Sequence, residues 1–283
     1  MCVAEFWQCR GMRIPFRGRP LVMGIVNVTP DSFSDGGRWM DPDAAVAHAL
    51  RLVEEGADLL DIGGESTRPG AEPVPPEAEA ERVVPVIRRL AALTDVPISV
   101  DTRRAEVADL AIAAGAVIVN DVAPLTEAPE MAEVVRKRGA GLVAMHARGT
   151  PQTMAGMTAY ADVTEEVAGA LEAAVAFALD AGIARASVVV DPGIGFAKDT
   201  DGNCALLARM ARLTAIAPVL IGASRKRFIG EICGEPEAAL RDGGSVGVAV
   251  WAALHGASVV RVHAVRESVQ ALKMVERLKV TER

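Results

Sequence analysis

The sequence predicts a single-domain α/β protein with the (β/α)8 architecture of a TIM barrel. Eight strand–helix units recur along the 283 residues, with no break in composition between them. Aromatic residues make up only 4% of the chain while Ala, Val and Leu dominate, which favours helices packed on a parallel sheet. An open doubly wound sheet is the competing fold. It usually has fewer units and a glycine-rich phosphate turn after its first strand, and the sequence contains no GxGxxG.

Residues 1–20 are interpreted as an N-terminal extension, a short strand or a hairpin that closes the bottom of the barrel, and residues 21–283 as the barrel itself. The extension lacks the apolar stretch of a signal peptide. No run of about 18 apolar residues occurs, so a membrane partner is not expected.

The first half of the chain supplies four units. Apolar runs at 21–28, 57–64, 97–101 and 117–122 are typical of buried parallel strands. A polar loop of some ten residues follows the first run, and a loop of that length is usually functional or disordered. Asp41-Pro42 then caps a helix over 43–55, which ends at Gly56. Further helices are expected over 77–93, up to Ala114 and over 128–138.

The second half completes the barrel. Apolar runs at 141–146, 187–192, 218–224 and 258–265 predict the last four strands. Helices are expected over 161–181, 245–255 and 266–279, where apolar residues recur at helical spacing. Residues 230–244 contain four Gly and one Pro and are interpreted as an insertion before the helix over 245–255.

Polar side chains stand at or just after the end of nearly every predicted strand. In a parallel barrel these ends converge on one face, where such enzymes place their active sites. Each residue alone has an ordinary structural interpretation: an Asp caps a helix, a His sits in the core, and a Lys or Arg is solvated. Their recurrence favours a ligand site. The set comprises Asn27, Asp61, Thr67, Arg68, Asp101, Asn120, His146, Asp191, Ser224, Lys226, Arg261 and His263.

The residue types divide this set into two chemistries. Two carboxylates, an amide and one cation suit a flat heterocycle with N–H donors on one edge and a carbonyl or ring nitrogen on the other. Those residues are Asp101, Asn120, Asp191 and Lys226. A second group suits an oxyanion such as a diphosphate, with Mg2+ held mainly by ligand oxygens and water because Asn27 alone is too few ligands. Those residues are Asn27, Arg68, Arg261 and His263.

Charge and cysteine content limit the partners and the compartment. The net charge is −7 and no basic stripe occurs, which argues against a nucleic-acid partner. The four cysteines show neither CxxC nor disulfide-like spacing. Free thiols in a reducing cytoplasm are therefore expected.

The motifs at the strand ends resemble those of the dihydropteroate synthase family along almost the whole barrel, about residues 20–278. The most specific are NVTPDSFSDGG within Leu21–Gly37 and GGESTRPGA within Asp61–Ala71. The others lie at Ile98–Thr102, Val119–Val122, Met145–Met154, Val190–Lys198, Ile221–Gly230 and Arg261–Val265. The resemblance implies a TIM barrel that joins 6-hydroxymethyl-7,8-dihydropterin diphosphate to 4-aminobenzoate and releases diphosphate.

The resemblance also implies a role for individual residues. Pterin contacts fall to Asp101, Asn120, Met145, Asp191 and Lys226. Diphosphate contacts fall to Asn27, Thr67, Arg68, Arg261 and His263, with Mg2+ as cofactor and Asn27 as its protein ligand. The 4-aminobenzoate site, which is also the sulfonamide site of the family, falls to Thr67, Pro69, Phe196, Ser224 and Lys226. Asp35 and Ser66 belong to loops expected to close over the substrates. Lys226, Arg261, Asp101 and Asp191 are the expected catalytic residues, and family members are commonly homodimers.

An SN1-like path is the expected mechanism, because an arylamine is a weak nucleophile and the dihydropterin methylene cation is resonance-stabilised. Loop closure would keep water from trapping that cation.

Three positions depart from the family pattern: Ala147-Arg148, Ala197 and Ala264. Ala264 stands where an Asp is usual, and we expect it to loosen the support of the site, which keeps a less active homologue in view. Three alternatives stay open. They are a pterin methyltransferase acting with a corrinoid protein, a homologue that binds pterin without condensing it, and a barrel enzyme for another phosphorylated metabolite.

Overall fold

The computed structural model describes residues 5–16, 18–29, 42–66 and 70–281, and they form the predicted barrel. Eight parallel strands pair in the order β8-β7-β6-β5-β4-β3-β10-β9. A parallel bridge between Val190 and Val219 joins the two ends of this order and closes the barrel. The strands are β3 (Leu21–Asn27), β4 (Leu59–Gly63), β5 (Ile98–Asp101), β6 (Ile118–Asp121), β7 (Gly141–Met145), β8 (Val188–Asp191), β9 (Leu220–Ile221) and β10 (Val259–Val262).

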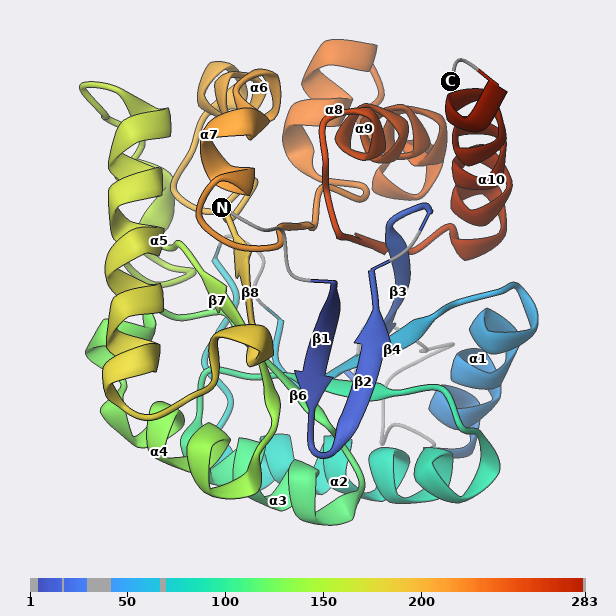
Figure 1. The fold of residues 1–283 in the computed structure, drawn as a ribbon, viewed down its shortest axis with the longest axis vertical. Coiled ribbons are helices and arrows are strands. Elements are labelled where there is room, and N and C mark those ends of the chain that lie inside the picture. The colour runs from blue at the N-terminus through green and yellow to red at the C-terminus, as the bar shows by residue number, and fades with distance from the viewer. Residues whose placement is uncertain (1–4, 17, 30–41, 67–69, 282–283) are drawn as a thin grey trace.

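Helices surround the barrel as an outer ring (Figure 1). They are α1 (Pro42–Glu54), α2 (Pro76–Leu93), α3 (Ala105–Ala114), α4 (Pro129–Arg138), α5 (Val163–Asp180), α6 (Thr200–Ala208), α7 (Met210–Thr214), α8 (Arg227–Cys233), α9 (Asp242–Leu254) and α10 (Val265–Thr281). Short 3-10 turns lie at Leu125–Glu127, Met154–Gly156, Arg185–Ser187 and Ala238–Leu240. No helix within the described ranges is long and apolar enough to cross a membrane.

Three helices had no counterpart in the sequence analysis. α6 and α7 fill the connection between β8 and β9, and α8 begins inside the motif at Ile221–Gly230 and runs into the predicted insertion. The α8 segment was missed because it is only seven residues long and contains Gly230, a poor helix former. α9 also begins at Asp242, three residues before the predicted Ser245.

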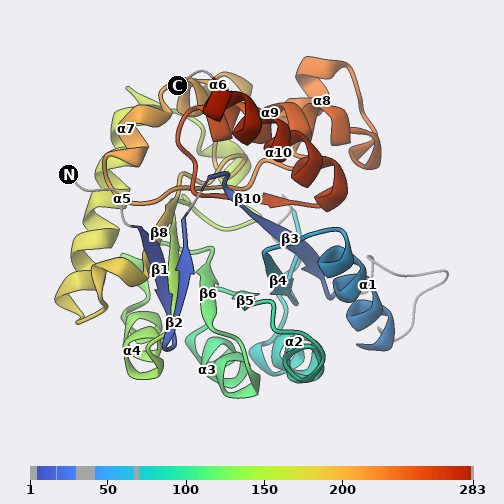
Figure 2. The same ribbon diagram turned by 45° about the vertical axis from the view of Figure 1, so that its right-hand side comes forward.

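An antiparallel hairpin, β1 (Phe6–Cys9) and β2 (Met12–Pro15), covers the N-terminal end of the barrel (Figure 2). The Trp7 side chain is fully buried there, and its indole N–H donates to the Ser187 carbonyl at 2.8 Å. Trp7, Cys9 and Ile14 pack on an apolar layer inside the barrel. That layer consists of Met23, Leu59, Ile118, Val143, Val189, Leu220 and Val259. The bottom of the barrel is therefore closed by apolar packing.

The next layer of the interior is polar. Side chains two residues apart on a strand point to the same face, so each apolar residue of the bottom layer has a successor two positions later that also faces inward. These successors are Ile25, Asp61, Asn120, Met145, Asp191, Gly222 and Arg261. The strand register thus places charged groups directly above the apolar layer, towards the C-terminal end of the barrel.

Candidate active site

A buried ion-pair network spans the polar layer. The Arg261 guanidinium on β10 donates from Nε to Asp61 Oδ2 on β4 and from one terminal nitrogen to Asp101 Oδ2 on β5, both at 2.6 Å. The Asn120 amide on β6 donates to the same Asp61 oxygen at 3.0 Å. The strand pairing explains this convergence, because Asp101 lies in register with Asn120 across β5 and β6.

Two oxygens of this network have no partner within the described residues. Asp61 Oδ1 and Asn120 Oδ1 are both buried, and neither accepts a hydrogen bond. Buried acceptors are almost always satisfied in native proteins, because leaving one unpaired costs about 1–3 kcal/mol. Acceptors held ready at the floor of an open-topped barrel point to a ligand that brings N–H donors.

Burial sets the protonation of the remaining charged groups. It raises the pKa of Asp101 above its ordinary value, although the neighbouring Arg261 opposes the shift. It also raises the pKa of Asp191, and there Lys226 opposes it. Conversely, burial lowers the pKa of Lys226 to about 8, with Asp191 opposing. At neutral pH Lys226 therefore keeps most of its charge but releases its proton more readily than a surface lysine.

The loop after β8 brings Phe196 to the site. The Lys226 ammonium lies 4.4 Å from the centre of the Phe196 ring and donates to the Ile194 carbonyl. The Asp191 carboxylate at the end of β8 accepts a hydrogen bond from the Gly193 amide at 2.7 Å. A cation above a half-buried aromatic ring, beside a carboxylate, forms a flat site that suits a second aromatic group.

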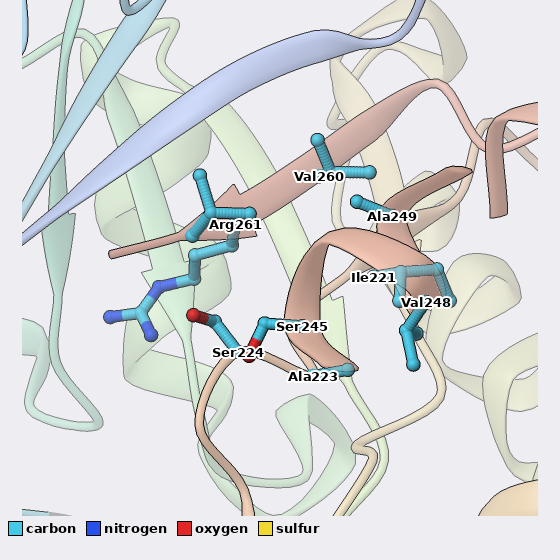
Figure 3. Close-up of a pocket in the computed structure, with 9 residues that line it drawn as sticks. Ile221, Ala223, Ser224, Ser245, Val248, Ala249, Val260 and Arg261 are labelled. Carbon is cyan, nitrogen blue, oxygen red and sulfur yellow. The ribbon is translucent and has the colours of Figure 1, made fainter. Parts of the chain in front are cut away.

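Ser224 and His263 follow the neighbouring strands β9 and β10. The Ser224 hydroxyl oxygen accepts from the His263 backbone N–H at 3.1 Å and lies 3.0 Å from His263 Nδ1. Behind them, a cavity of about 10 Å³ lies between β10 and α9. Figure 3 shows the Arg261 guanidinium extending away from Ile221 and Val248, two of the apolar residues that line this cavity. The functional end of Arg261 therefore faces the barrel interior and not this packing gap.

The structure brings together most of the predicted residues. Met145 ends β7 in register with Asp191, and Asn27 ends β3 beside Gly63. Ser66 is half-buried in the loop after β4. Arg261 was predicted to contact the diphosphate, and in the structure it donates to the predicted pterin residue Asp101. The two predicted groups of residues are therefore in direct contact. Four predicted residues lie outside the described ranges: Asp35, Thr67, Arg68 and Pro69.

Two features were assigned no role from the sequence. Asp61 was one polar strand end among many, and its link to Arg261 joins positions 200 residues apart. The sequence feature that could have identified Asp61 is its position two residues after Leu59, which places both side chains on the inward face of β4. Lys198 is buried and its ammonium donates to the Gly193 and Phe196 carbonyls at 3.0 and 2.8 Å. Burial lowers the pKa of Lys198 to about 7. The motif at Val190–Lys198 ends at this residue, but no role was predicted for it.

The third departure, Ala264, is buried, and its carbonyl accepts from the Ser268 hydroxyl at 2.7 Å. The network of Arg261, Asp61 and Asp101 is held without any side-chain hydrogen bond from this position.

Comparison with known proteins places this geometry in a family. The model of the family described as "Pterin binding enzyme" matches residues 23–263. The dihydropteroate synthase of Mycobacterium leprae is 48% identical over 261 residues, which cover 90% of this chain and 92% of that protein.

Solved structures agree with the sequence comparison. Xanthomonas albilineans dihydropteroate synthase with 4-aminobenzoic acid superposes with a TM-score of 0.91 at 47% identity, covering 98% of this chain and 99% of that one. The same enzyme in complex with 7,8-dihydropteroate gives 0.87 at 46% identity, covering 96% and 97%. Yersinia pestis dihydropteroate synthase with a sulfonamide drug gives 0.91 at 41% identity, covering 97% and 99%.

Replacing Asp61 tests the ion-pair network. Asp61→Ala leaves the buried Arg261 with one carboxylate instead of two, so we expect the free energy of unfolding to fall by about 3 kcal/mol. Urea unfolding followed by circular dichroism measures the loss. The matched control is Asp109→Ala, which breaks an ion pair of two hydrogen bonds with Arg138 on the surface and should cost less than about 1 kcal/mol. Equal losses in the two variants would show that Arg261 does not depend on Asp61.

Proposed function

Since the chain belongs to the dihydropteroate synthase family of pterin-binding enzymes, we propose that it condenses 6-hydroxymethyl-7,8-dihydropterin diphosphate with 4-aminobenzoate. The products are 7,8-dihydropteroate and diphosphate, as in folate synthesis. The single observation that supports this choice best is the pair of unpartnered acceptors, Asp61 Oδ1 and Asn120 Oδ1, at the floor of the barrel. The amino-pyrimidinone edge of a pterin carries N–H donors of the kind that such acceptors require.

The charged groups around this floor match the rest of a pterin. Asp101 and Asp191 add carboxylate oxygens, and Lys226 supplies a donor for a carbonyl or ring nitrogen. Met145 offers an apolar, polarisable side chain to the ring face. The ligand would therefore lie flat across the polar layer, with its diphosphate directed to the mouth of the barrel, where Asn27 ends β3 and His263 follows β10.

The arylamine takes the site closer to the mouth. The Phe196 ring with Lys226 above it offers a flat contact, and the Ser224 hydroxyl lies on the adjacent loop. Thr67 and Pro69 are the other proposed contacts and lie outside the described residues. Because Phe196 and Ser224 follow their strands while Asn120 and Asp191 lie within them, the two substrates would stack along the barrel axis with the pterin deeper.

We propose a dissociative, SN1-like reaction at the junction of the two sites. The bond between the methylene carbon and the diphosphate oxygen breaks, and its electron pair leaves with diphosphate towards Arg68, Arg261 and His263. Asp101 and Asp191 stabilise the resulting cation. The arylamine nitrogen then forms the new C–N bond with its lone pair and gives up one proton to the released diphosphate.

Positional isotope exchange tests the dissociative step. With 18O in the bridging position of pterin diphosphate and no 4-aminobenzoate present, we expect the label to scramble into non-bridging positions of recovered substrate. Mass spectrometry or 31P NMR reads the exchange. Recovered substrate with no scrambling, from enzyme that turns over once the arylamine is added, would count against the SN1-like path.

Mg2+ is proposed as an ion carried in with the diphosphate. Within the described ranges, no cluster of three His, Cys, Asp or Glu residues could hold a metal, and Asn27 offers a single amide oxygen. That donor set fits Mg2+, which usually keeps several waters and binds substrate phosphates. When bound, the ion would offset the negative charge that develops on the leaving group.

A product assay tests the activity. Wild-type protein with both substrates and Mg2+ should form dihydropteroate, detected by mass spectrometry, and a chelator should abolish the product. Lys226→Ala and Arg261→Ala should each lower kcat/KM by roughly 100-fold or more, because each removes a charged group from the reacting site. Lys137→Ala and Arg138→Ala on the surface of α4 are the matched controls and should leave the rate unchanged.

The same assay separates the alternatives. Pterin diphosphate binding by calorimetry without product would identify a homologue that binds pterin but does not condense it. Folded protein with neither binding nor product would refute the pterin assignment and favour another phosphorylated metabolite. Methyl transfer with a corrinoid protein would make no use of 4-aminobenzoate.

A homodimer is proposed through α9 and α10, which pack against each other on one side of the barrel (Figure 1). These helices expose large apolar side chains, namely Trp251, Leu254, Met274 and Leu278, with exposed fractions of 43–60%. Apolar patches of this kind commonly mark protein interfaces. Light scattering should give the mass of two chains. Leu278→Asp should shift it towards one chain, while Leu93→Asp, equally exposed on α2, should not.

A cytoplasmic location is proposed as well. The cysteines within the described ranges, Cys9, Cys204 and Cys233, are all free, which suits a reducing compartment. Immunodetection in fractionated cells tests the location, and recovery outside the cytoplasmic fraction would refute it.

A further inference from the structure

The loop after β8 contains three alternating residues with positive φ. Their φ angles are 67° at Gly193, 81° at Gly195 and 50° at Ala197. The first two positions require glycine, because a Cβ would lie 1.9 Å from the His146 carbonyl oxygen at Gly193 and 2.8 Å from Lys226 Cδ at Gly195. Ala197 has a Cβ, and the left-handed conformation is disfavoured for every residue other than glycine. The loop is thus held in a shape that one of its own residues opposes.

One contact that holds this shape comes from Tyr160. Its hydroxyl donates to the Ala197 carbonyl at 3.0 Å. The Tyr160 ring is itself covered by the Arg148 guanidinium, 3.8 Å from the ring centre, and Arg148 is fixed by an ion pair with Glu166 at 2.6 Å. Two of the three departures from the family motifs, Arg148 and Ala197, therefore belong to one connected set of contacts.

The other contact comes from Lys198. Its buried ammonium donates to the carbonyls of Gly193 and Phe196, and it lies 3.0 Å from His146 Nδ1. These three neighbours match the three donors of an ammonium, and two of them are backbone carbonyls of the loop itself. Lys198 therefore ties both ends of the turn to the end of β7.

The loop carries the flat surface of the proposed arylamine site. Phe196 immediately precedes Ala197, so a change of backbone conformation at 197 would shift the backbone that carries the Phe196 ring. Lys226 depends on the same loop, because it lies over that ring and donates to the Ile194 carbonyl. A change in the loop would displace the aromatic surface and the cation together, while Asp61, Asp101 and Asn120 on other strands would keep their positions.

We propose that Tyr160 and Lys198 are positioning residues for the arylamine: they hold the strained 193–198 loop so that Phe196 and Lys226 face the second substrate. The proposal deepens the proposed function and rests on it. Residues that maintain a conformation with backbone strain are expected next to functional side chains.

The test compares Tyr160→Phe, Ala197→Gly and the double variant. Tyr160→Phe removes one hydrogen bond without leaving a cavity, so we expect KM for 4-aminobenzoate to rise roughly three- to tenfold while KM for pterin diphosphate stays within about twofold. Ala197→Gly relieves the strain and should leave both constants within about twofold. In the double variant, glycine should recover at least about half of the loss in KM on a logarithmic scale.

Lys198→Met and an independent readout complete the experiment. Lys198→Met leaves the Phe196 carbonyl without its donor and removes one of the two donors to the Gly193 carbonyl, which still accepts from the Phe196 N–H. It should therefore raise KM for 4-aminobenzoate more than Tyr160→Phe does. Hydrogen–deuterium exchange over residues 193–198 needs no catalytic activity, and both Tyr160→Phe and Lys198→Met should accelerate it. Arg10→Gly is the matched control, because Arg10 has a positive φ of 46° in the hairpin at the other end of the barrel and its replacement should change neither KM nor this exchange.

The outcomes distinguish the two proposals. Equal changes in the two KM values, or no recovery in the double variant, would overturn the positioning role. Unchanged exchange at 193–198 in both Tyr160→Phe and Lys198→Met would also overturn it, whatever the activity. A wild type that forms no dihydropteroate would refute only the proposed condensation. The exchange rates of the variants relative to the wild type would then decide on the positioning role by themselves.

Discussion

The interior of the barrel depends on one buried cation, Arg261, and on the two carboxylates that hold it. A guanidinium inside a barrel is tolerated only where opposite charges and acceptors surround it. Asp61 and Asp101 meet that need from two neighbouring strands, and Asn120 joins through the Asp61 oxygen it shares with Arg261. The apolar layer and the Trp7 hairpin below keep water from reaching this network from the bottom of the barrel. The acceptors that are left over become available to a ligand from above.

Much of this arrangement could be predicted from the sequence because strand ends are local features. Asp101, Asn120 and Asp191 each end an apolar run, and a barrel brings such ends together. The pairing of Asp61 with Arg261 could not be predicted, because it depends on which strand faces which across the interior. Lys198 ends the motif at Val190–Lys198, but its role could not be predicted because two of its three partners are backbone carbonyls, which leave no trace in residue types. The short α8 was hidden by glycine and by its length.

Strain occurs on both sides of the mouth. Besides Ala197, Arg225 has a positive φ of 60°, directly between Ser224 and Lys226. Arg225 is held by two hydrogen bonds of 2.7 Å to Asp242, and its amide donates to Ser245 at 2.9 Å. The loop that carries Lys226 is thus fixed from α9, and the loop that carries Phe196 is held by Tyr160, which lies just before α5, and by its own Lys198. Such a design separates the rigidity of the site from its chemistry.

The closed floor has a kinetic consequence. With Trp7 and its neighbours filling one end, the described part of the barrel leaves only the opposite end for both substrates to enter. A ring lying on the polar layer sits beneath the position offered by Phe196 and Ser224. An arylamine that arrived first would block the path of the heterocycle behind it. The architecture therefore favours a compulsory sequence, in which the deeper ligand enters first and the joined product leaves as one piece, arylamine end foremost.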